Sequence, residues 1–273
     1  MNTKRPKVEF LISTMHRTDL GFLDSIFKNI DFNSIPILIV NQTSKHKNLV
    51  SHKSNIRVIN SYEKGLSKSR NHALNNAIGE ICFIVDDDVE YLPGALNTVL
   101  KAYEDYPDAA FISFQFLTKN GKVETLYQKK SGLQNNLLHK QHLHSFEITL
   151  KPEVLLESNI QFNTCFGIGA LFHSGEEQVL RDDVVRKGHK VFYVNKPIVK
   201  HLDIFSVAKE GSKEFTRTIT AVKYRLHKNL IYLWLLRYIW QLFKRKVIKL
   251  AQTKQIWTYG VKAVSDYKTY CKK

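Results

Sequence analysis

Residues 56–88 read IRVINSYEKGLSKSRNHALNNAIGEICFIVDDD, and this stretch decides the fold. A short β-like run at 56–59 precedes a segment at 67–78 whose apolar residues have helical spacing. The apolar run at 81–85 then predicts a strand buried on both faces, and it ends in three aspartates at 86–88. A strand, a helix and a second strand in this order are typical of a parallel α/β unit.

The same alternation continues on both sides of this stretch. Strands are predicted at 8–13 and 35–40, and helices at 18–30 and 93–103. Ser67 is the predicted N-cap of the central helix. We therefore expect an α/β fold with a Rossmann-like, mostly parallel sheet flanked by helices. Ligands of such sheets bind beyond the carboxyl ends of the strands.

Charge divides the chain into two unequal parts. The 273 residues suit one large domain, or one domain with an appendage. Residues 1–210 carry 26 basic and 23 acidic side chains, whereas residues 211–273 carry 15 Lys and Arg against two carboxylates. A tail with a charge of +13 is expected to be drawn to phosphates, in lipid head groups or in nucleic acid.

The cationic tail also contains an apolar, aromatic run at 229–243, followed by Lys-Arg-Lys. The run is shorter than the roughly 20 residues of a spanning helix, and Arg237 and Gln241 interrupt it. Two interpretations have equal weight: a helix in the interface of an anionic membrane, or a helix packed on the catalytic domain. Nucleic acid is a third interpretation, but no recognised binding motif accompanies the charge, so no specific nucleic-acid partner is predicted.

The cysteines and the first residues bear on location. Cys82, Cys165 and Cys271 are odd in number and lack metal-like spacing, so neither a disulfide framework nor a zinc site is predicted. The first residues are basic and lack the apolar core of a signal peptide. The prediction is a cytoplasmic protein in a reducing compartment, with a peripheral position on the inner face of the plasma membrane as an extension.

Polar residues follow three of the predicted strands. Thr14 and His16 follow the first, Asn41 follows the second, and the aspartates 86–88 follow the fourth. Three successive carboxylates repel one another, and the sequence shows no local Lys or Arg partner for them. Mg²⁺ or Mn²⁺ would relieve this repulsion and would bridge to a diphosphate. The alternative is a solvated acidic turn.

Segments 63–71, 77–81 and 83–88 together resemble a known family. Their sequences, EKGLSKSRN, AIGEI and FIVDDD, are similar to the G-L-S-x-A-R-N, A-x-G-E and DxD signature of family 2 glycosyltransferases. These are GT-A enzymes that use nucleotide-diphospho-sugars. The resemblance extends over about residues 7–205.

The resemblance implies a division of the chain. Residues 1–205 would form the GT-A domain, with a nucleotide-sugar-binding half at about 1–100 and an acceptor half at 101–205. Residues 206–273 would form a basic, amphipathic helical tail.

The resemblance also implies a nucleotide-sugar site built from Thr14, His16, Asn41, Arg70, Asp86 and Asp87. The family threonine at the place of Thr14 helps to hold the base and ribose. Asn41 stands where an Asp usually accepts the uracil N3–H, which leaves the base open, although a UDP-sugar is favoured. Arg70 matches an arginine near the diphosphate, and the alternative for it is an exposed helix arginine.

A metal site for Mn²⁺ or Mg²⁺ is implied at Asp86, Asp88 and His201. His201 ends a segment, 191–201, that is expected to be a strand, a turn and a short extended stretch. The histidines at 139, 142 and 144 are interpreted as a solvated acceptor loop and not as a metal site.

The segment 174–188 is similar to the family's G-E-D-x-D-L-x-x-R pattern, with Glu177 at the place of the usual catalytic Asp. Glu177 is therefore the candidate base, with Glu176 beside it as the second candidate. An inverting transfer needs such a carboxylate to take the proton of the acceptor hydroxyl. The alternative is that both acids only favour the first turn of a helix. The glycine-bearing loop 166–172 is similar to the family segment beside the transferred sugar.

Two classes of function follow. The favoured one is a metal-dependent glycosyltransferase that moves a sugar to a surface-glycan or lipid-linked saccharide acceptor, and the resemblance implies that the transfer is inverting. The alternatives are a nucleotidyl- or phosphoryl-transferase on a related fold, and a non-catalytic, basic membrane-docking protein on a degenerate transferase fold.

Overall fold

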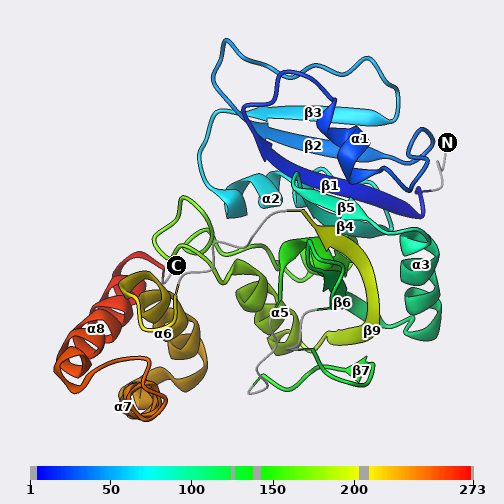
Figure 1. Ribbon diagram of the computed structural model, residues 1–273. Coiled ribbons are helices and arrows are strands. Elements are labelled where there is room, and N and C mark those ends of the chain that lie inside the picture. The colour runs from blue at the N-terminus through cyan, green and yellow to red at the C-terminus, as the bar shows by residue number, and fades with distance from the viewer. Residues whose placement is uncertain (1–4, 124–126, 138–142, 203–208, 272–273) are drawn as a thin grey trace.

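A nine-stranded sheet forms the centre of the protein, in the order β3-β2-β1-β4-β8-β6-β9-β5 with β7 paired to β9 (Figure 1). The structure is a computed structural model, and it describes residues 5–123, 127–137, 143–202 and 209–271. The strands are β1 (Val8–Met15), β2 (Ile37–Gln42), β3 (Ile56–Ser61), β4 (Ile81–Asp86), β5 (Val89–Tyr91), β6 (Ala109–Leu117), β7 (Gly132–Leu133), β8 (Ile148–Leu150) and β9 (Lys190–His201). The helices are α1 (Phe22–Ile26), α2 (Leu66–Asn75), α3 (Ala95–Asp105), α4 (Pro152–Glu157), α5 (Glu176–Arg186), α6 (Lys213–His227), α7 (Ile231–Lys244) and α8 (Thr253–Tyr270).

The first four strands of the chain make the parallel part of the sheet. β1 lies between β2 and β4, β3 extends the sheet beyond β2, and β6 pairs in parallel with β9. The short strands β5, β7 and β8 pair antiparallel. The predicted α/β class with a mostly parallel sheet, flanking helices and a helical tail is therefore confirmed.

Each face of the sheet carries its own apolar cluster, because successive side chains of a strand point to opposite faces. Phe10 and Ile12 of β1 join the cluster that includes α1 and α3. Leu11, between them, joins the cluster that includes α2, α4 and α5. Burial on both faces explains why β2 reads as an apolar run without alternation.

Three local predictions differ from the structure. The helix expected at 18–30 is only the five-residue α1, which begins after Gly21. Ser67 lies inside α2 and not at its N-cap, which is Gly65, and the Ser67 hydroxyl donates to the distant carbonyl of Phe166. The segment expected as a strand, a turn and an extended stretch is the single strand β9.

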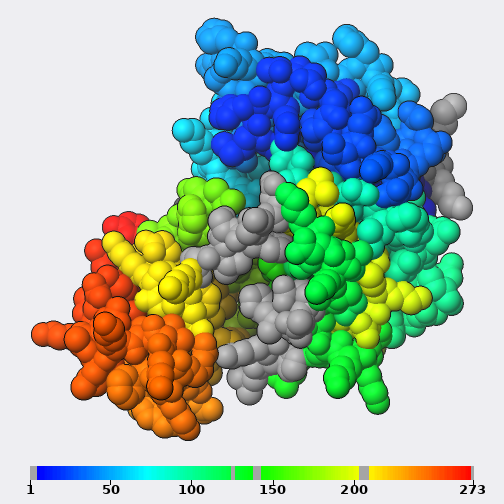
Figure 2. All heavy atoms as spheres, viewed as in Figure 1, coloured from blue at the N-terminus to red at the C-terminus, as the bar shows by residue number. Residues whose placement is uncertain are grey.

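The tail forms a unit of three helices, α6, α7 and α8. This unit projects from the sheet and its flanking helices, here called the body, at the lower left of the space-filling view (Figure 2). Its core is continuous with the body, because α6 and α8 bury Ala221 and Ala263 in one cluster with Phe166 and Phe172. α6 and α8 therefore pack on the body, whereas α7, the helix of the apolar run, packs mainly on α6 and α8. Among the described residues, no helix combines the length and hydropathy that crossing a bilayer requires.

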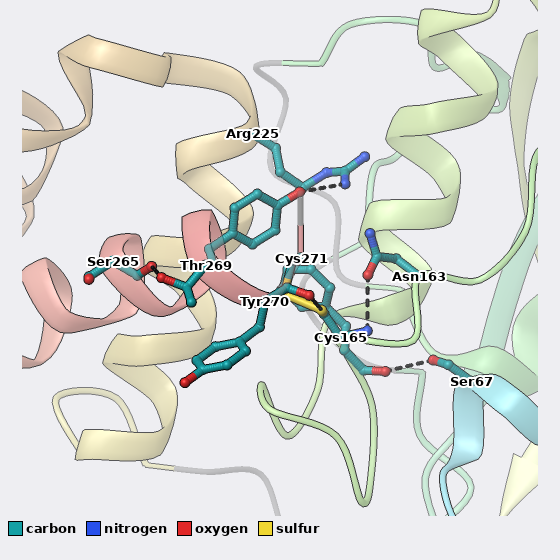
Figure 3. Close-up of a disulfide and its surroundings, with 10 residues drawn as sticks. Ser67, Asn163, Cys165, Arg225, Ser265, Thr269, Tyr270 and Cys271 are labelled. Carbon is teal, nitrogen blue, oxygen red and sulfur yellow. Dashed lines mark hydrogen bonds between the residues drawn. A yellow bond between two sulfur atoms is a disulfide. The ribbon is translucent and has the colours of Figure 1, made fainter. Parts of the chain in front are cut away.

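One disulfide joins the tail to the body, between Cys165 and Cys271 (Figure 3). The two Cα atoms lie 6.0 Å apart, within the usual range for such a bond. From the sequence, no disulfide framework was predicted, and this single bond was not predicted either. The expectation of a reducing compartment loses the support that it took from the cysteine count. Cys82 is a free, buried thiol.

Candidate active site

Two hydrogen bonds bring the glycine-bearing loop of residues 166–172 against the start of α2. The Ser67 hydroxyl donates to the carbonyl of Phe166 at 2.6 Å, and the Leu66 N–H donates to the carbonyl of Ile168 at 3.0 Å. Gly167 has a φ of +104°, and a Cβ there would lie 3.2 Å from the Glu176 carboxyl carbon. The loop therefore approaches α2 and α5 closely, and glycine is needed at position 167.

Arg70 of α2 is the centre of the site. Its side chain is 2% exposed, and its guanidinium donates to Asp86 at 2.9 Å, Glu176 at 3.0 Å and Glu177 at 3.1 Å. The three carboxylates outweigh the effect of burial and raise the pKa of Arg70, so the guanidinium stays charged. The alternative of an exposed helix arginine does not apply.

This cluster holds one positive charge among three carboxyl groups. Burial raises the pKa of Glu177 above the ordinary carboxyl value, and the carboxylate of Glu176 raises it further. The guanidinium of Arg70 opposes both effects to a smaller extent. Glu177 is thus a carboxyl group whose affinity for a proton is increased, as a general base requires.

The aspartates after β4 have no local Lys or Arg partner, as the sequence indicates, but two of them have distant ones. Asp86 pairs with Arg70 and accepts a hydrogen bond from the Ser145 hydroxyl at 2.5 Å. Asp87 pairs with Arg17 at 2.7 Å. These partners come from elements far away in the sequence, which is why no local pattern revealed them.

Thr14, at the end of β1, lies beside the middle aspartate. Its hydroxyl donates to Asp87 at 2.5 Å, and the Arg17 guanidinium donates to the same oxygen. Two predicted donor-site residues, Thr14 and Asp87, are thereby brought together at the carboxyl end of the parallel strands.

Asn41 and His16 occupy different environments. Asn41 is fully buried, and its amide accepts from the N–H of Arg17 and donates to the Arg17 carbonyl and to Asn60. A contact between Asn41 and a base would need this pairing to change. His16 is exposed and has a φ of 56°, and its N–H donates to the carbonyl of Gln42.

Asp88 and His201 lie together because β5 pairs antiparallel with the end of β9. The His201 Nε2 is 3.3 Å from Asp88 Oδ2, and Asp88 Oδ1 is buried without a hydrogen-bond partner. An unpartnered carboxylate oxygen beside an imidazole fits two ligands of Mn²⁺ or Mg²⁺. Both oxygens of Asp86 are engaged elsewhere, and no group of three or more candidate ligands occurs among the described residues.

A second buried carboxyl group borders the cluster. Glu147 accepts from the N–H of His144 at 3.0 Å and from the Tyr127 hydroxyl. Burial raises the pKa of Glu147 to about 8, with a smaller contribution from the charge of Glu177. His144 lies at the start of this turn, whereas residues 139 and 142 lie outside the described residues.

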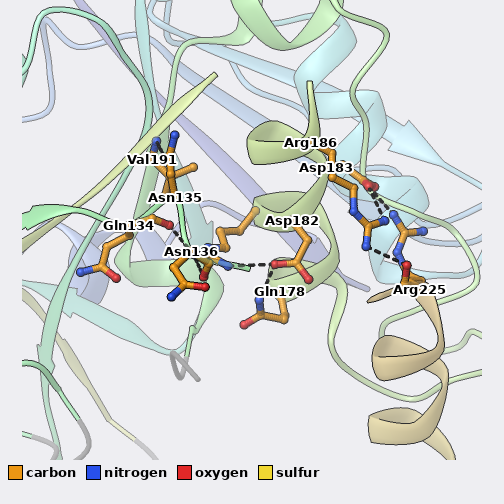
Figure 4. Close-up of polar contacts among 10 residues, drawn as sticks. Gln134, Asn135, Asn136, Gln178, Asp182, Asp183, Arg186, Val191 and Arg225 are labelled. Carbon is orange, nitrogen blue, oxygen red and sulfur yellow. Dashed lines mark hydrogen bonds and ion pairs between the residues drawn. The ribbon is translucent and has the colours of Figure 1, made fainter. Parts of the chain in front are cut away.

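α5, which carries the two candidate bases, is anchored by the buried Arg181. Its guanidinium pairs with Asp182 at 3.0 Å and donates to the carbonyls of Gln134 and Asn136 (Figure 4). On the outer side of the helix, Asp183 pairs with Arg225 of α6. The helix is thus fixed between the body and the tail.

Sequence reasoning missed four residues that shape the site: Arg17, Ser145, Glu147 and Arg181. Arg17 carried a usable signal, because it follows the first strand together with Thr14 and His16. The other three are brought into place by contacts that no spacing in the sequence indicates.

The chain is an α/β protein with charged residues gathered at the carboxyl ends of its parallel strands, where ligands of such sheets bind. The family model for glycosyl transferase family 2 matches residues 20–172, more than half of the chain, and the chain belongs to this family. The predicted family is thereby confirmed.

One curated relative comes from Campylobacter jejuni and is named GalNAc(5)-diNAcBac-PP-undecaprenol beta-1,3-glucosyltransferase. It is 31% identical over 113 residues, which are 37% of this chain and 36% of the relative. The matched segment thus spans about a third of the length of that relative.

Solved structures of S. aureus TarS share the fold. The complex with UDP has a TM-score of 0.60 at 18% identity, and it covers 94% of this chain and 81% of that chain. The complex with UDP-GlcNAc has a TM-score of 0.56 at 17% identity, and it covers 97% and 82% respectively. The predicted GT-A type of fold agrees with this similarity.

Proposed function

We propose that the protein is a glycosyltransferase that moves a sugar from a nucleotide-diphospho-sugar to a saccharide or lipid-linked acceptor. The observation that carries this proposal is the position of Arg70, which joins Asp86 at the end of β4 to Glu176 and Glu177 at the start of α5. The guanidinium connects the donor half of the site to the candidate base.

The donor would bind at the carboxyl ends of β1, β2 and β4. Thr14, His16, Asn41, Arg70, Asp86 and Asp87 are the proposed contacts, and the guanidinium of Arg70 suits a diphosphate. A UDP-sugar is favoured, and the TarS complexes with UDP and UDP-GlcNAc support this choice by similarity of fold.

The proposed metal ion, Mn²⁺ or Mg²⁺, would be held by Asp88 and His201. Asp88 Oδ1 supports this assignment because it is buried without a partner. Asp86, the third predicted ligand, would first have to release Arg70 or Ser145. When bound, the ion would neutralise charge on the diphosphate.

Glu177 is the proposed general base of an inverting reaction. The acceptor hydroxyl oxygen would form a bond to the anomeric carbon while the bond from that carbon to the diphosphate breaks. The hydroxyl proton would pass to the Glu177 carboxylate, and the nucleoside diphosphate would leave with the bonding electrons. The raised pKa of Glu177 supports this role, and Glu176 would hold Arg70 in place.

The acceptor is proposed from weaker similarity. The Campylobacter jejuni relative is named for an undecaprenol-linked glycan, which favours a lipid-linked saccharide. An anionic membrane surface is a further proposed partner, at the cytoplasmic face, and its structural basis is argued in the next subsection.

The test is hydrolysis of a panel of nucleotide-sugars without acceptor, in Mn²⁺ and in excess EDTA. Asp88→Ala should abolish metal-dependent donor binding and hydrolysis while the circular dichroism spectrum stays unchanged. Asp105→Ala, an exposed carboxylate on α3, is the matched control and should behave as the unmodified protein. Full activity of Asp88→Ala, or undiminished turnover in EDTA, would overturn the metal assignment.

A further inference from the structure

The outer side of α7 carries an exposed apolar row. Leu233, Leu236 and Trp240 are 65%, 54% and 58% exposed, and the row continues at Leu230 and Phe243. Spacings of three and four residues place these side chains on one side of the helix. Large side chains in such a continuous row are unusual on a protein surface and indicate a binding face.

The opposite side of α7 is already used for packing. Leu235 and Leu242 are fully buried in a cluster with Ile256 of α8. Gly260 of α8 permits this close approach, because a Cβ there would lie 2.5 Å from Leu235. α6 and α8 attach the unit to the body, and the disulfide at Cys271 closes it (Figure 3). The exposed row is therefore held outward by a rigid support.

Positive charge lies beside the row and beyond its C-terminal end. Arg237, Lys244, Lys246 and Lys249 are exposed, and none of them has an ion pair among the described residues. Lys244 lies over the ring of Trp240 at 5.1 Å from its centre. Glu210 pairs with Arg245 and not with any of these four cations. Apolar side chains flanked by unpaired cations match a bilayer surface, where acyl chains lie beneath anionic head groups.

We propose that the outer face of α7 docks on an anionic lipid bilayer, with the helix lying in the interface. Leu233, Leu236 and Phe243 would enter the acyl boundary, and Trp240 would lie at head-group depth. Arg237 and the lysines after α7 would contact the lipid phosphates. Docking is independent of sugar transfer, and it would hold the enzyme at the surface where a lipid-linked acceptor is found.

The test is co-sedimentation of the full chain with vesicles of phosphatidylcholine alone or with phosphatidylglycerol added. Binding should require phosphatidylglycerol and should weaken at high salt, because the charges are screened. Arg237→Gln should lower the affinity about fivefold. Leu236→Ser should lower it by roughly three- to tenfold through lost apolar burial.

Leu133→Ser is the matched control, because Leu133 on β7 is 53% exposed, like Leu236, and is the same residue type. The control should bind vesicles as the unmodified chain does, and Leu236→Ser should still hydrolyse donor in solution. The proposal is overturned if the full chain ignores phosphatidylglycerol vesicles at low salt. It is also overturned if Leu236→Ser and Leu133→Ser lose vesicle binding equally. The same holds if the chain forms dimers that Leu236→Ser disperses, since a second copy of the chain would then cover the outer face of α7.

Discussion

The centre around Arg70 and the outer face of α7 depart from the usual distribution of side chains in opposite ways. The first buries a guanidinium among three carboxyl groups, and the second exposes leucines and a tryptophan to water. Neither arrangement favours folding. Buried charges lose the free energy of hydration, and exposed apolar side chains give up the stabilisation that their burial would provide. The comparison teaches that stability alone does not account for either region; the proposed functions would explain the first by a substrate and the second by a lipid surface.

Glu177→Gln should have the largest effect. It keeps the shape of the side chain but removes its basicity, so turnover should fall by about 10²–10⁴-fold while donor binding survives. Steady-state transfer and titration with nucleotide would measure the two quantities. Glu157→Gln, an exposed acid at the end of α4, is the control and should have no effect. If Glu176→Gln proves to be the inactive variant, the base is the neighbouring carboxylate.

Arg70→Ala should lower the free energy of unfolding by about 3–5 kcal/mol at neutral pH, because it leaves buried carboxylates without a counter-charge. The loss should shrink in acid, where protonation of these carboxyl groups removes their repulsion. Urea unfolding at two pH values would show this. Arg237→Ala, on the exposed face of α7, should change the stability by no more than about 0.5 kcal/mol. Equal losses of stability in Arg70→Ala and Arg237→Ala would contradict the difference drawn between the two regions.

The buried carboxyl of Glu147 should make stability depend on pH. Its pKa is raised to about 8 in the folded protein, so the folded state holds this proton more tightly than the unfolded state. Its stabilising contribution is complete below the ordinary carboxyl pKa and is lost as the pH rises through about 8. Glu147→Gln should flatten unfolding free energy against pH over that window. An unchanged slope would show that Glu147 titrates normally.

Leu236→Ala should have the smallest effect, within about 0.5 kcal/mol of the unmodified stability. The adjacent Leu235 is fully buried and should behave oppositely, with Leu235→Ala costing about 2–5 kcal/mol. Thermal unfolding of the two variants in the absence of lipid would separate them. A large loss from Leu236→Ala would mean that the outer row supports the fold and not a docking face.

The sequence predicted the strands at the centre of the sheet well, because their burial on both faces leaves uninterrupted apolar runs. It also predicted that Thr14, Asp86 and Asp87 would gather, since residues after parallel strands share one edge of a sheet. The residues alone indicated where the candidate site lies. The roles proposed for its residues came from the family resemblance.

The hydrogen-bond and ion-pair partners within the site could not be predicted from the sequence. Ser67 looked like an N-cap, yet its hydroxyl bonds a carbonyl 99 positions later in the chain. The pairing of Arg17 with Asp87 depends on how β1 and β4 lie together. Such contacts are set by tertiary packing, which cannot be predicted from hydrophobic periodicity or from helix-capping rules. The disulfide was missed for the same reason, since an odd cysteine count does not say which thiols meet.

That disulfide makes residues 165–271 a covalent ring, whose two cysteines are separated by 106 in sequence number. Glu177, His201 and the whole of α7 lie on the ring. One proteolytic cut anywhere within it would leave a single linked molecule until a reductant is added. Closing a ring of this size also restricts the unfolded chain, which is worth about 4–5 kcal/mol in the chain-entropy model. If the chain were cut within α7, both fragments of the helix would therefore stay covalently attached to the protein.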